Sequence, residues 1–293
     1  MDKLNKKLIK IHKKLSDNKL DLKSKDYALF QDKLHLYLDS PVHDTSKVEQ
    51  HIIASFWKNA YKNYKDGGYI TNDDYTAKVR FSYEMKKIQK LIQTNTKDKT
   101  RALDIGCGNG RYAREFAKMF DEVVAIDLSK KQIRHNKKNN TLTNLTYLYE
   151  NFITMPKNEL GSFDFVFVGD IFMYTNDKEV EKTFLALLKL LGDSGILLVR
   201  ESTQIVGFSS WKSKNYVAYY RNVDFYKNGV FSRYFLEKQR NYAYHLYYLN
   251  KYFHTFPKMK KKVQKNPLLL EKIVKEFSDI YTKSSHFFLY KKG

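Results

Sequence analysis

The stretch from Thr100 to Ser129 constrains the fold more than any other part of the 293-residue chain. It contains an apolar segment (102–105), a glycine turn (106–110), a helical segment and a second apolar segment that ends at Asp127. A strand, a glycine turn, a helix and a second strand form half of a nucleotide-binding β-α-β unit, in which a ligand lies against the turn and the helix N-terminus. We therefore expect an α/β domain built on a parallel sheet.

Two carboxylates narrow the class of ligand. Asp104 precedes the first glycine, where its charge would repel a pyrophosphate but would attract a cation. Asp127, at the tip of the second strand, is placed to accept hydrogen bonds from two ribose hydroxyls. This combination disfavours a dinucleotide and favours a ligand that carries both an ammonium group and a ribose.

The sequences Leu103-Asp104-Ile105-Gly106-Cys107-Gly108-Asn109-Gly110 and Ile126-Asp127-Leu128-Ser129 resemble the first two cofactor motifs of class I S-adenosylmethionine-dependent methyltransferases. The resemblance implies a doubly wound, mostly parallel seven-stranded sheet over residues 57–293, with a loose match from Lys238 to Lys283. It implies S-adenosylmethionine as the cofactor. Its expected contacts are Asp104, Gly106, Cys107, Gly108, Asn109, Gly110, Asp127, Leu128, Asn151, Phe152 and Gly169.

Asn151 and Phe152 follow the predicted third strand, in the turn that holds adenine in the resembling family. In that family a polar side chain contacts the exocyclic amine and an apolar neighbour lies against the ring. The family more often has an acid where Asn151 stands. This assignment can therefore shift by one residue.

The net charge of +21 would ordinarily indicate a nucleic acid, an anionic membrane or an acidic substrate as partner. Only nine of the 53 basic residues are Arg, and Lys occurs with abundant Asn, Tyr, Phe and Ile. All of these have AT-rich codons, so genome composition can account for much of the lysine. The charge predicts a basic surface without identifying its partner.

Cys107 is the single cysteine, so the chain has no internal disulfide and no zinc site built from cysteines. The eight histidines show no spacing typical of a metal site, and we predict no metal. The sequence contains no apolar run long enough to span a membrane and no signal-peptide core. These features predict a cytoplasmic protein.

Residues 1–56 are expected to form a helical N-terminal extension, because Leu4, Leu8, Ile11 and Leu15 recur on one helical face among lysines. Such a helix can lie on an anionic membrane or pair with a partner helix. Packing on its own domain or on a second copy of the chain, as a homodimer, is the favoured interpretation. Aromatic residues that follow, such as Trp57, are either pocket residues or core, and core is favoured.

The apolar run 163–168 predicts a strand buried on both faces. Parallel strands end at one edge of a sheet, so Asp170 should lie at the same crevice as the glycine turn, as a catalytic group or as a helix cap. A sugar hydroxyl acceptor would need a base, and Asp170, His43, His51 and Glu201 are the candidates. A phosphate or carboxylate oxygen would need only cationic positioning.

The segment 204–253 is unusually aromatic and is the predicted acceptor-binding insertion. Arg200, Tyr216, Tyr220 and Arg221 are the candidate acceptor ligands, since arginine can bind a phosphate or carboxylate bidentately. Short motifs around them resemble methyltransferases of bacterial surface-glycan biosynthesis. The same aromatic residues could instead stack RNA bases or form a tyrosine-rich core.

We therefore expect a methyltransferase that acts on a small-molecule or glycan acceptor, anionic in character, with O-methylation in surface-polysaccharide biosynthesis as the leading form. An RNA methyltransferase would explain the basic charge, although the sequence has no Asn-Pro-Pro-Tyr-like tetrapeptide. A non-catalytic cofactor-binding scaffold is the third hypothesis. The pair Asp104 and Asp127 makes the scaffold the weaker alternative.

Overall fold

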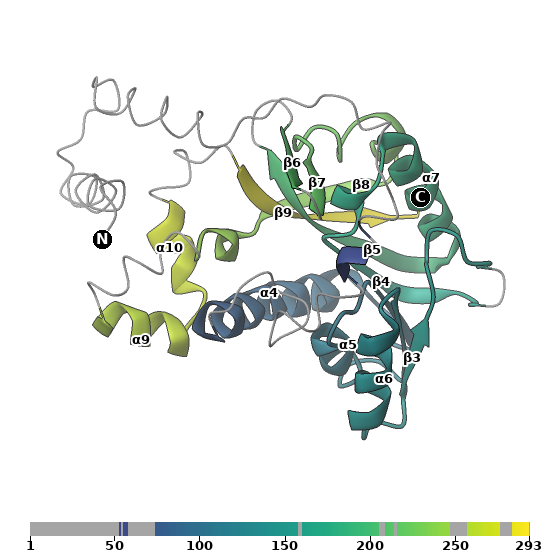
Figure 1. Ribbon diagram of the computed structural model, residues 1–293, viewed down its shortest axis with the longest axis horizontal. Coiled ribbons are helices and arrows are strands. Elements are labelled where there is room, and N and C mark those ends of the chain that lie inside the picture. Colours follow the sequence, from purple (N-terminus) through teal and green to yellow (C-terminus); the bar gives the residue numbers. More distant parts are fainter. Residues whose placement is uncertain are drawn as a thin grey trace.

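A computed structural model describes residues 53, 55–57, 74–157, 160–204, 209–213, 216–246, 257–275 and 283–292 (Figure 1). The predicted N-terminal extension, including His43 and His51, lies outside the described residues except for Ile53, Ser55 and Phe56. Within these ranges, no helix combines the length and apolarity that crossing a membrane requires.

A seven-stranded sheet forms the centre of the domain. Its strands, in spatial order, are β3 (Leu145–Tyr149), β2 (Glu122–Asp127), β1 (Arg101–Ile105), β4 (Phe163–Gly169), β5 (Leu191–Gln204), β9 (Lys283–Lys291) and β8 (Phe235–Arg240). The first five are parallel, and β9 is antiparallel to both of its neighbours. The predicted doubly wound, mostly parallel seven-stranded sheet is confirmed. The order reverses between β1 and β4, where such sheets bind ligands.

Helices cover both faces of the sheet. They are α4 (Asp74–Asn95), α5 (Arg111–Phe116), α6 (Lys130–Asn139), α7 (Asp177–Lys189), α9 (Pro257–Lys265) and α10 (Leu269–Lys275), with short 3₁₀ turns η1 (Phe172–Tyr174), η2 (Gly229–Phe231) and η3 (Tyr242–His245). A separate hairpin pairs β6 (Ser209–Ser213) with β7 (Tyr216–Tyr220). Figure 1 shows α4, α5 and α6 on the side of the sheet opposite α7.

Successive side chains along each strand point to opposite faces of the sheet, so they pack alternately in one or the other of these two helical layers. In β4, Phe165 and Phe167 pack with α4, α5 and α6, whereas Val166 and Val168 pack with α7. All four side chains are at most 1% exposed. This is why β4 reads as a continuous apolar run, since a parallel strand between two helical layers must be apolar on both faces.

Two polar segments form regular elements. The segment from Arg200 to Thr203 continues β5, because β9 pairs with it as far as Gln204. The basic segment from Lys258 to Lys265 lies in helix α9, whose Val263 is fully buried. In both cases a tertiary partner stabilises an element that polar composition alone did not indicate.

The segment 192–195 lies inside β5 and interrupts the regular pairing of β5 with β4. Phe163 pairs with Leu191 and Phe165 with Ile196, so extra residues are accommodated on β5. A Cβ on Gly195 would lie 2.6 Å from the carbonyl oxygen of Phe163, so the backbones approach too closely there for a side chain. The glycine therefore permits the bulge without ending the strand.

Candidate functional site

The glycine turn between β1 and α5 is fixed to the adjoining strand. The backbone N–H groups of Gly106 and Cys107 donate to the carbonyl of Ile126 in β2, at 2.8 and 3.0 Å. Gly106, Gly108 and Gly110 have φ values of +72°, +52° and +73°. Glycine adopts a positive φ without strain, whereas other residues do so at an energetic cost, which favours glycine at each of these positions.

Gly106 also touches the segment that leaves β4. A Cβ added to Gly106 would lie 2.3 Å from Cδ1 of Ile171. Ile171 immediately follows Asp170, so the turn and the carboxyl end of β4 are in contact. The predicted meeting of these two segments at one sheet edge is thereby seen in the structure.

Asp127 joins the turn to the start of α6. Its Oδ2 accepts a hydrogen bond from the N–H of Gly108 at 2.9 Å, and its Oδ1 accepts one from Ser129 at 2.7 Å. Burial raises the pKa of Asp127, while the two backbone donors act to lower it. Each carboxylate oxygen can accept further bonds, which is what a ribose diol needs.

Asp104 is a buried carboxylate with one unsatisfied oxygen. The residue is 1% exposed, and Oδ2 has no hydrogen-bond partner among the described residues. Burial, followed by the charge of Asp127, raises the pKa of Asp104 to about 7. Because an unpaired buried charge is unfavourable, a cationic ligand group would satisfy this oxygen. The residues present therefore fit a cofactor with an ammonium group and a ribose.

The other residues predicted to line the turn differ in burial. Cys107 is 5% exposed and burial raises the pKa of its thiol, which makes it a poor nucleophile. Asn109 accepts a hydrogen bond at Oδ1 from the Arg111 N–H at 3.2 Å. Leu128 is half-buried after Asp127.

The predicted adenine residues lie beyond β3, at the edge of the domain. Asn151 is exposed, and its Oδ1 accepts a bond from the Ile153 N–H at 3.1 Å. Phe152 is 5% exposed and belongs to the core on the α7 side of the sheet, with Nζ of Lys157 4.8 Å from its ring centroid. Phe152 thus packs as a core residue, while Asn151 remains accessible.

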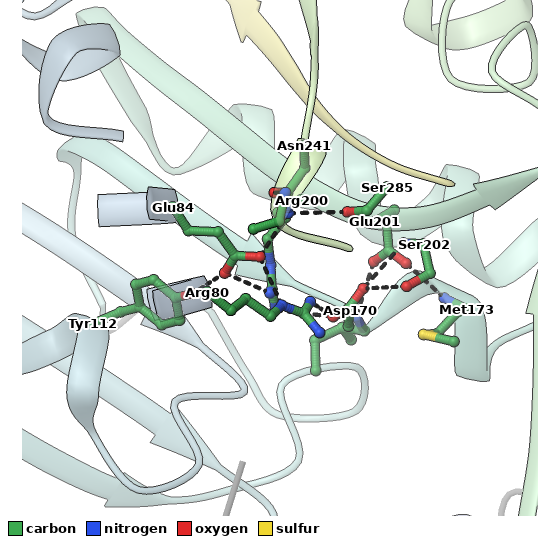
Figure 2. Close-up of polar contacts among 12 residues, drawn as sticks. Arg80, Glu84, Tyr112, Asp170, Met173, Arg200, Glu201, Ser202, Asn241 and Ser285 are labelled. Carbon is green, nitrogen blue, oxygen red and sulfur yellow. Dashed lines mark hydrogen bonds and ion pairs between the residues drawn. The ribbon is translucent and has the colours of Figure 1, made fainter. Parts of the chain in front are cut away.

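A chain of buried charges lies behind the carboxyl ends of β4 and β5 (Figure 2). Glu84 in α4 is fully buried and accepts from Nε of Arg80 at 2.8 Å and from Nη1 of Arg200 at 2.8 Å. The hydroxyl of Tyr112 and the amide of Asn241 also donate to Glu84. Burial acts to raise the pKa of Glu84, but Arg200 and Arg80 outweigh burial and lower this pKa to about 2.

Asp170 connects this chain to the crevice. It follows β4 and is the one described non-glycine residue with positive φ, +53°. Its Oδ1 accepts from the N–H and the hydroxyl of Ser202 at 3.0 and 3.1 Å, and its Oδ2 lies 3.0 Å from Nη2 of Arg200 and 3.4 Å from Nη2 of Arg80. The Asp170 side chain remains 21% exposed. A strained, partly exposed carboxylate at a ligand-binding edge is typical of a functional position.

Gly169 permits this arrangement at the end of β4. It is half-buried, and a Cβ there would lie 3.0 Å from Nη2 of Arg200. Arg200 itself is 6% exposed and is paired with Glu84 and Asp170. In the structure Arg200 orients the carboxylates, and its charge is not directed to solvent.

Glu201 faces the opposite side of β5 from Arg200 and is fully buried. Its carboxylate accepts backbone N–H bonds from Ile171 at 2.9 Å, Phe172 at 2.8 Å and Met173 at 3.2 Å. Burial, followed by the charge of Asp170, raises the pKa of Glu201 to about 8. These contacts use Glu201 to hold the segment after β4, which does not favour its predicted role as a base that touches the acceptor.

Arg221, a predicted acceptor ligand, is 1% exposed. Its Nε donates to Asp177 at 2.7 Å, and its other nitrogens donate to the carbonyls of Phe172 and Thr175. Arg221 therefore fixes η1 and the start of α7, an arrangement that does not favour direct contact with an acceptor. Tyr216 and Tyr220 begin and end β7, and Tyr220 packs against a small apolar cluster that includes Tyr174.

Sequence reasoning missed Arg80, Glu84, Tyr112 and Asn241 as members of the charge network. The spacing of four between Arg80 and Glu84 was a usable signal, because residues four apart share one face of a helix. The pairing of Glu84 with Arg200, 116 residues away, had no local signal. Among the residues described, no group of three or more His, Cys, Asp or Glu side chains is arranged to hold a metal ion.

Comparison with known proteins finds similarity to methyltransferases. Residues 102–195 match the family model described as a methyltransferase domain. Phosphoethanolamine N-methyltransferase 1 of Triticum aestivum is 31% identical over 160 residues, which cover 53% of this chain and 31% of the relative. The protein of the same name in Arabidopsis thaliana is 30% identical over 127 residues, which cover 42% of this chain and 26% of the relative. The chain thus spans less than a third of the length of these curated relatives.

Solved structures share the fold. A S-adenosylmethionine-dependent methyltransferase of Leishmania major has a TM-score of 0.54 and 16% identity, and the match covers 72% of this chain and 84% of that chain. Coclaurine N-methyltransferase bound to N-methylheliamine and S-adenosylhomocysteine has a TM-score of 0.53 and 11% identity, over 99% of this chain and all of that chain. At such identities the likeness concerns the architecture.

Proposed function

We propose that this chain is a class I S-adenosylmethionine-dependent methyltransferase that methylates the nitrogen of a small phosphorylated amine. The match of residues 102–195 to a methyltransferase domain and the fold shared with solved methyltransferases support the first part of this proposal. The single observation that carries this proposal is Asp170, a partly exposed carboxylate next to the glycine turn. A carboxylate in this position can bind the ammonium group of the acceptor. After the ammonium has lost a proton to solvent, Asp170 can accept a hydrogen bond from a remaining N–H and so orient the nitrogen lone pair toward the methyl group.

The cofactor residues of the proposal are those of the glycine turn. Asp104 would bind the ammonium group of S-adenosylmethionine, and Asp127 would bind the ribose hydroxyls. When bound, S-adenosylmethionine supplies an activated methyl group. The chain then contributes orientation and the exclusion of water rather than a strong base.

Arg80 is the proposed contact for the acceptor's phosphate. Its side chain is 20% exposed, against 7% for Arg200, and its Nη2 lies beside Asp170. A guanidinium and a carboxylate at adjacent positions match the two charges of a phosphorylated amine. The names of the relatives support this substrate class, since those reported above are phosphoethanolamine N-methyltransferases.

This proposal replaces the predicted O-methylation of a glycan. The relatives reported above are named for an N-methylation, and neither name mentions a saccharide. Nothing in the described residues supports the predicted homodimer.

Calorimetric titration with S-adenosylhomocysteine tests the cofactor site. We expect one site per chain with micromolar affinity, and at least a tenfold loss in Asp127→Ala, since a lost hydrogen bond to a charged group is worth about 1.5–3 kcal/mol. Asp121→Ala is the matched control, because this carboxylate is exposed before β2 and outside the turn. Wild-type affinity in a folded Asp127→Ala variant would contradict the assigned ribose contact.

Methyl transfer to phosphoethanolamine, ethanolamine and a phosphorylated sugar then tests the acceptor. The proposal expects turnover of phosphoethanolamine, a higher KM for ethanolamine and no methylation of the sugar. Asp170→Asn should lower kcat without changing S-adenosylhomocysteine affinity. Efficient methylation of the sugar hydroxyl would restore the glycan hypothesis, and cofactor binding without turnover of any acceptor would favour the scaffold hypothesis.

A further inference from the structure

Asn136, near the end of α6, contacts the glycine turn from behind. Its Nδ2 donates a hydrogen bond to the carbonyl oxygen of Gly108 at 2.8 Å, across 28 residues of sequence. The residue is 2% exposed. None of the cofactor motifs includes this position, so the contact adds a residue to the site described above.

The two backbone polar groups of Gly108 are both held by side chains. Its N–H donates to Asp127 at 2.9 Å, and its carbonyl accepts from Asn136. Gly108 has a φ of +52°. Because a glycine backbone is flexible, contacts must hold Gly108 in this conformation if the turn is to keep one shape. The side chains of Asp127 and Asn136 therefore hold this residue from opposite ends of its backbone.

Helix α6 connects the two contacts. Ser129, the residue before α6, donates its N–H to Oδ1 of Asp127 at 2.7 Å. Asn136 lies seven residues later, which is two helical turns and the same face. A rigid helix thus fixes Asp127 at its start and Gly108 two turns further on.

Packing does not account for the choice of asparagine. Oδ1 of Asn136 is buried and has no hydrogen-bond partner among the described residues. A buried amide with an unsatisfied oxygen destabilises a folded protein relative to an apolar residue of similar size. The amide's remaining contribution is the bond to Gly108.

We propose that Asn136 is a positioning residue for S-adenosylmethionine, which holds Gly108 so that Asp127 presents its carboxylate to the ribose. This inference rests on the proposed cofactor site. It predicts that loss of the Asn136 amide weakens cofactor binding without a matching loss of folding stability.

The test compares Asn136→Leu and Asn136→Ala with Asn139→Ala in the full chain. Asn139 lies on the same helix but is exposed, and its amide donates to the carbonyl of His135 at 2.7 Å. Calorimetry should show S-adenosylhomocysteine binding weakened about five- to tenfold in both Asn136 variants and unchanged in Asn139→Ala. The thermal midpoint of ligand-free Asn136→Leu should equal or exceed that of the wild type.

Steady-state kinetics provides a second readout. The KM for S-adenosylmethionine should rise by the same factor in Asn136→Ala, while the acceptor KM stays constant. Wild-type affinity in Asn136→Leu and Asn136→Ala would overturn this inference alone, as would an affinity loss that only accompanies partial unfolding. Failure of the wild-type chain to bind S-adenosylhomocysteine would overturn the proposed function and this inference together.

Discussion

Two buried carboxylates, Glu84 and Asp104, have opposite pKa shifts. Both are at most 1% exposed, so burial alone would raise both pKa values. Glu84 is paired with Arg80 and Arg200, whose charges bring its pKa to about 2. Asp104 has Asp127 as a neighbour instead, and its pKa is about 7. Glu84 is therefore ionised as the counter-ion of two arginines, whereas Asp104 is expected to become fully ionised when a cationic ligand group binds beside it.

Replacement of Glu84 should be strongly destabilising. Glu84→Gln leaves Arg80 and Arg200 without their buried counter-ion, and removal of one partner from a buried pair costs about 3–5 kcal/mol. Glu115→Gln is the control, because its pair with Lys118 is on the surface and should change stability by less than about 1 kcal/mol. Urea denaturation measures both changes. Equal, small effects would show that the buried network does not stabilise the fold.

Cofactor affinity should depend on pH through Asp104. Its folded-state pKa of about 7 lies above its ordinary value of 3.8, so folding stability falls as pH rises from about 4 to about 7. A bound ammonium group favours the ionised form, which reverses the sign for binding. S-adenosylhomocysteine should therefore bind about tenfold more tightly at pH 8 than at pH 6.

Titrations at several pH values in matched ionic strength check this prediction. Asp104→Asn should bind weakly at every pH and lose the dependence, because its amide cannot ionise. A flat profile in the wild-type protein would contradict the assignment of Asp104 to the ammonium group.

At the scale of elements, the glycine turn and the exit from β4 act as one unit. Ile171 fills the space that a side chain on Gly106 would need. The backbone N–H of Ile171 is in turn held by Glu201. Movement of either segment would therefore displace the other, which links the cofactor residues to Asp170.

Gly106→Ala tests this contact. The variant combines a positive φ, which costs about 1 kcal/mol, with an overlap that costs a further 1–3 kcal/mol or so. Gly229→Ala is the matched control, since it has a φ of +57° but no atom within 4 Å of the added Cβ. Gly106→Ala should lose more stability and also weaken S-adenosylhomocysteine binding. Equal losses of stability in the two variants would mean that the Ile171 side chain moves aside without an energetic cost.

The sequence predicted those elements whose signal is local. Apolar runs identified β1, β2 and β4, and the parallel-sheet rule brought Asp170 to the same edge as the glycine turn. Asn176, the cap of α7, was not predicted, although its side chain accepts from the Glu179 N–H at 2.9 Å. Asn176, and not Asp170, therefore caps α7, so the alternative interpretation of Asp170 as the cap of the next helix is wrong.

Features that depend on distant partners escaped prediction. Arg200 and Arg221 were both interpreted as acceptor ligands, because arginine can bind a phosphate or carboxylate bidentately. Both side chains are buried in the structure, because Glu84 from α4 pairs with Arg200 and Asp177 from α7 pairs with Arg221. A local sequence pattern does not predict either of these pairs. The same holds for β5, whose polar end is a strand only because β9 pairs with it.

The whole molecule carries a net charge of +21, which is the remaining argument for an RNA substrate. Lysines on α6 and α9 are exposed, apart from the half-buried Lys260, and they are spread over separate helices. A diffuse positive surface attracts polyanions through counterion release without recognising a base. The charge therefore predicts non-specific attraction of polyanions, RNA among them, but not the methylation of RNA.

Single-stranded RNA should bind this protein weakly and without sequence preference. Its affinity should fall by roughly a hundredfold or more between about 50 and 200 mM salt, because the attraction comes from many phosphate contacts. S-adenosylhomocysteine affinity should change little over the same range, since its contacts are buried in the glycine turn. Fluorescence anisotropy with a labelled oligonucleotide and parallel calorimetry separate the two responses. RNA binding that persists at 200 mM salt, together with methyl incorporation into the RNA, would instead favour the RNA methyltransferase.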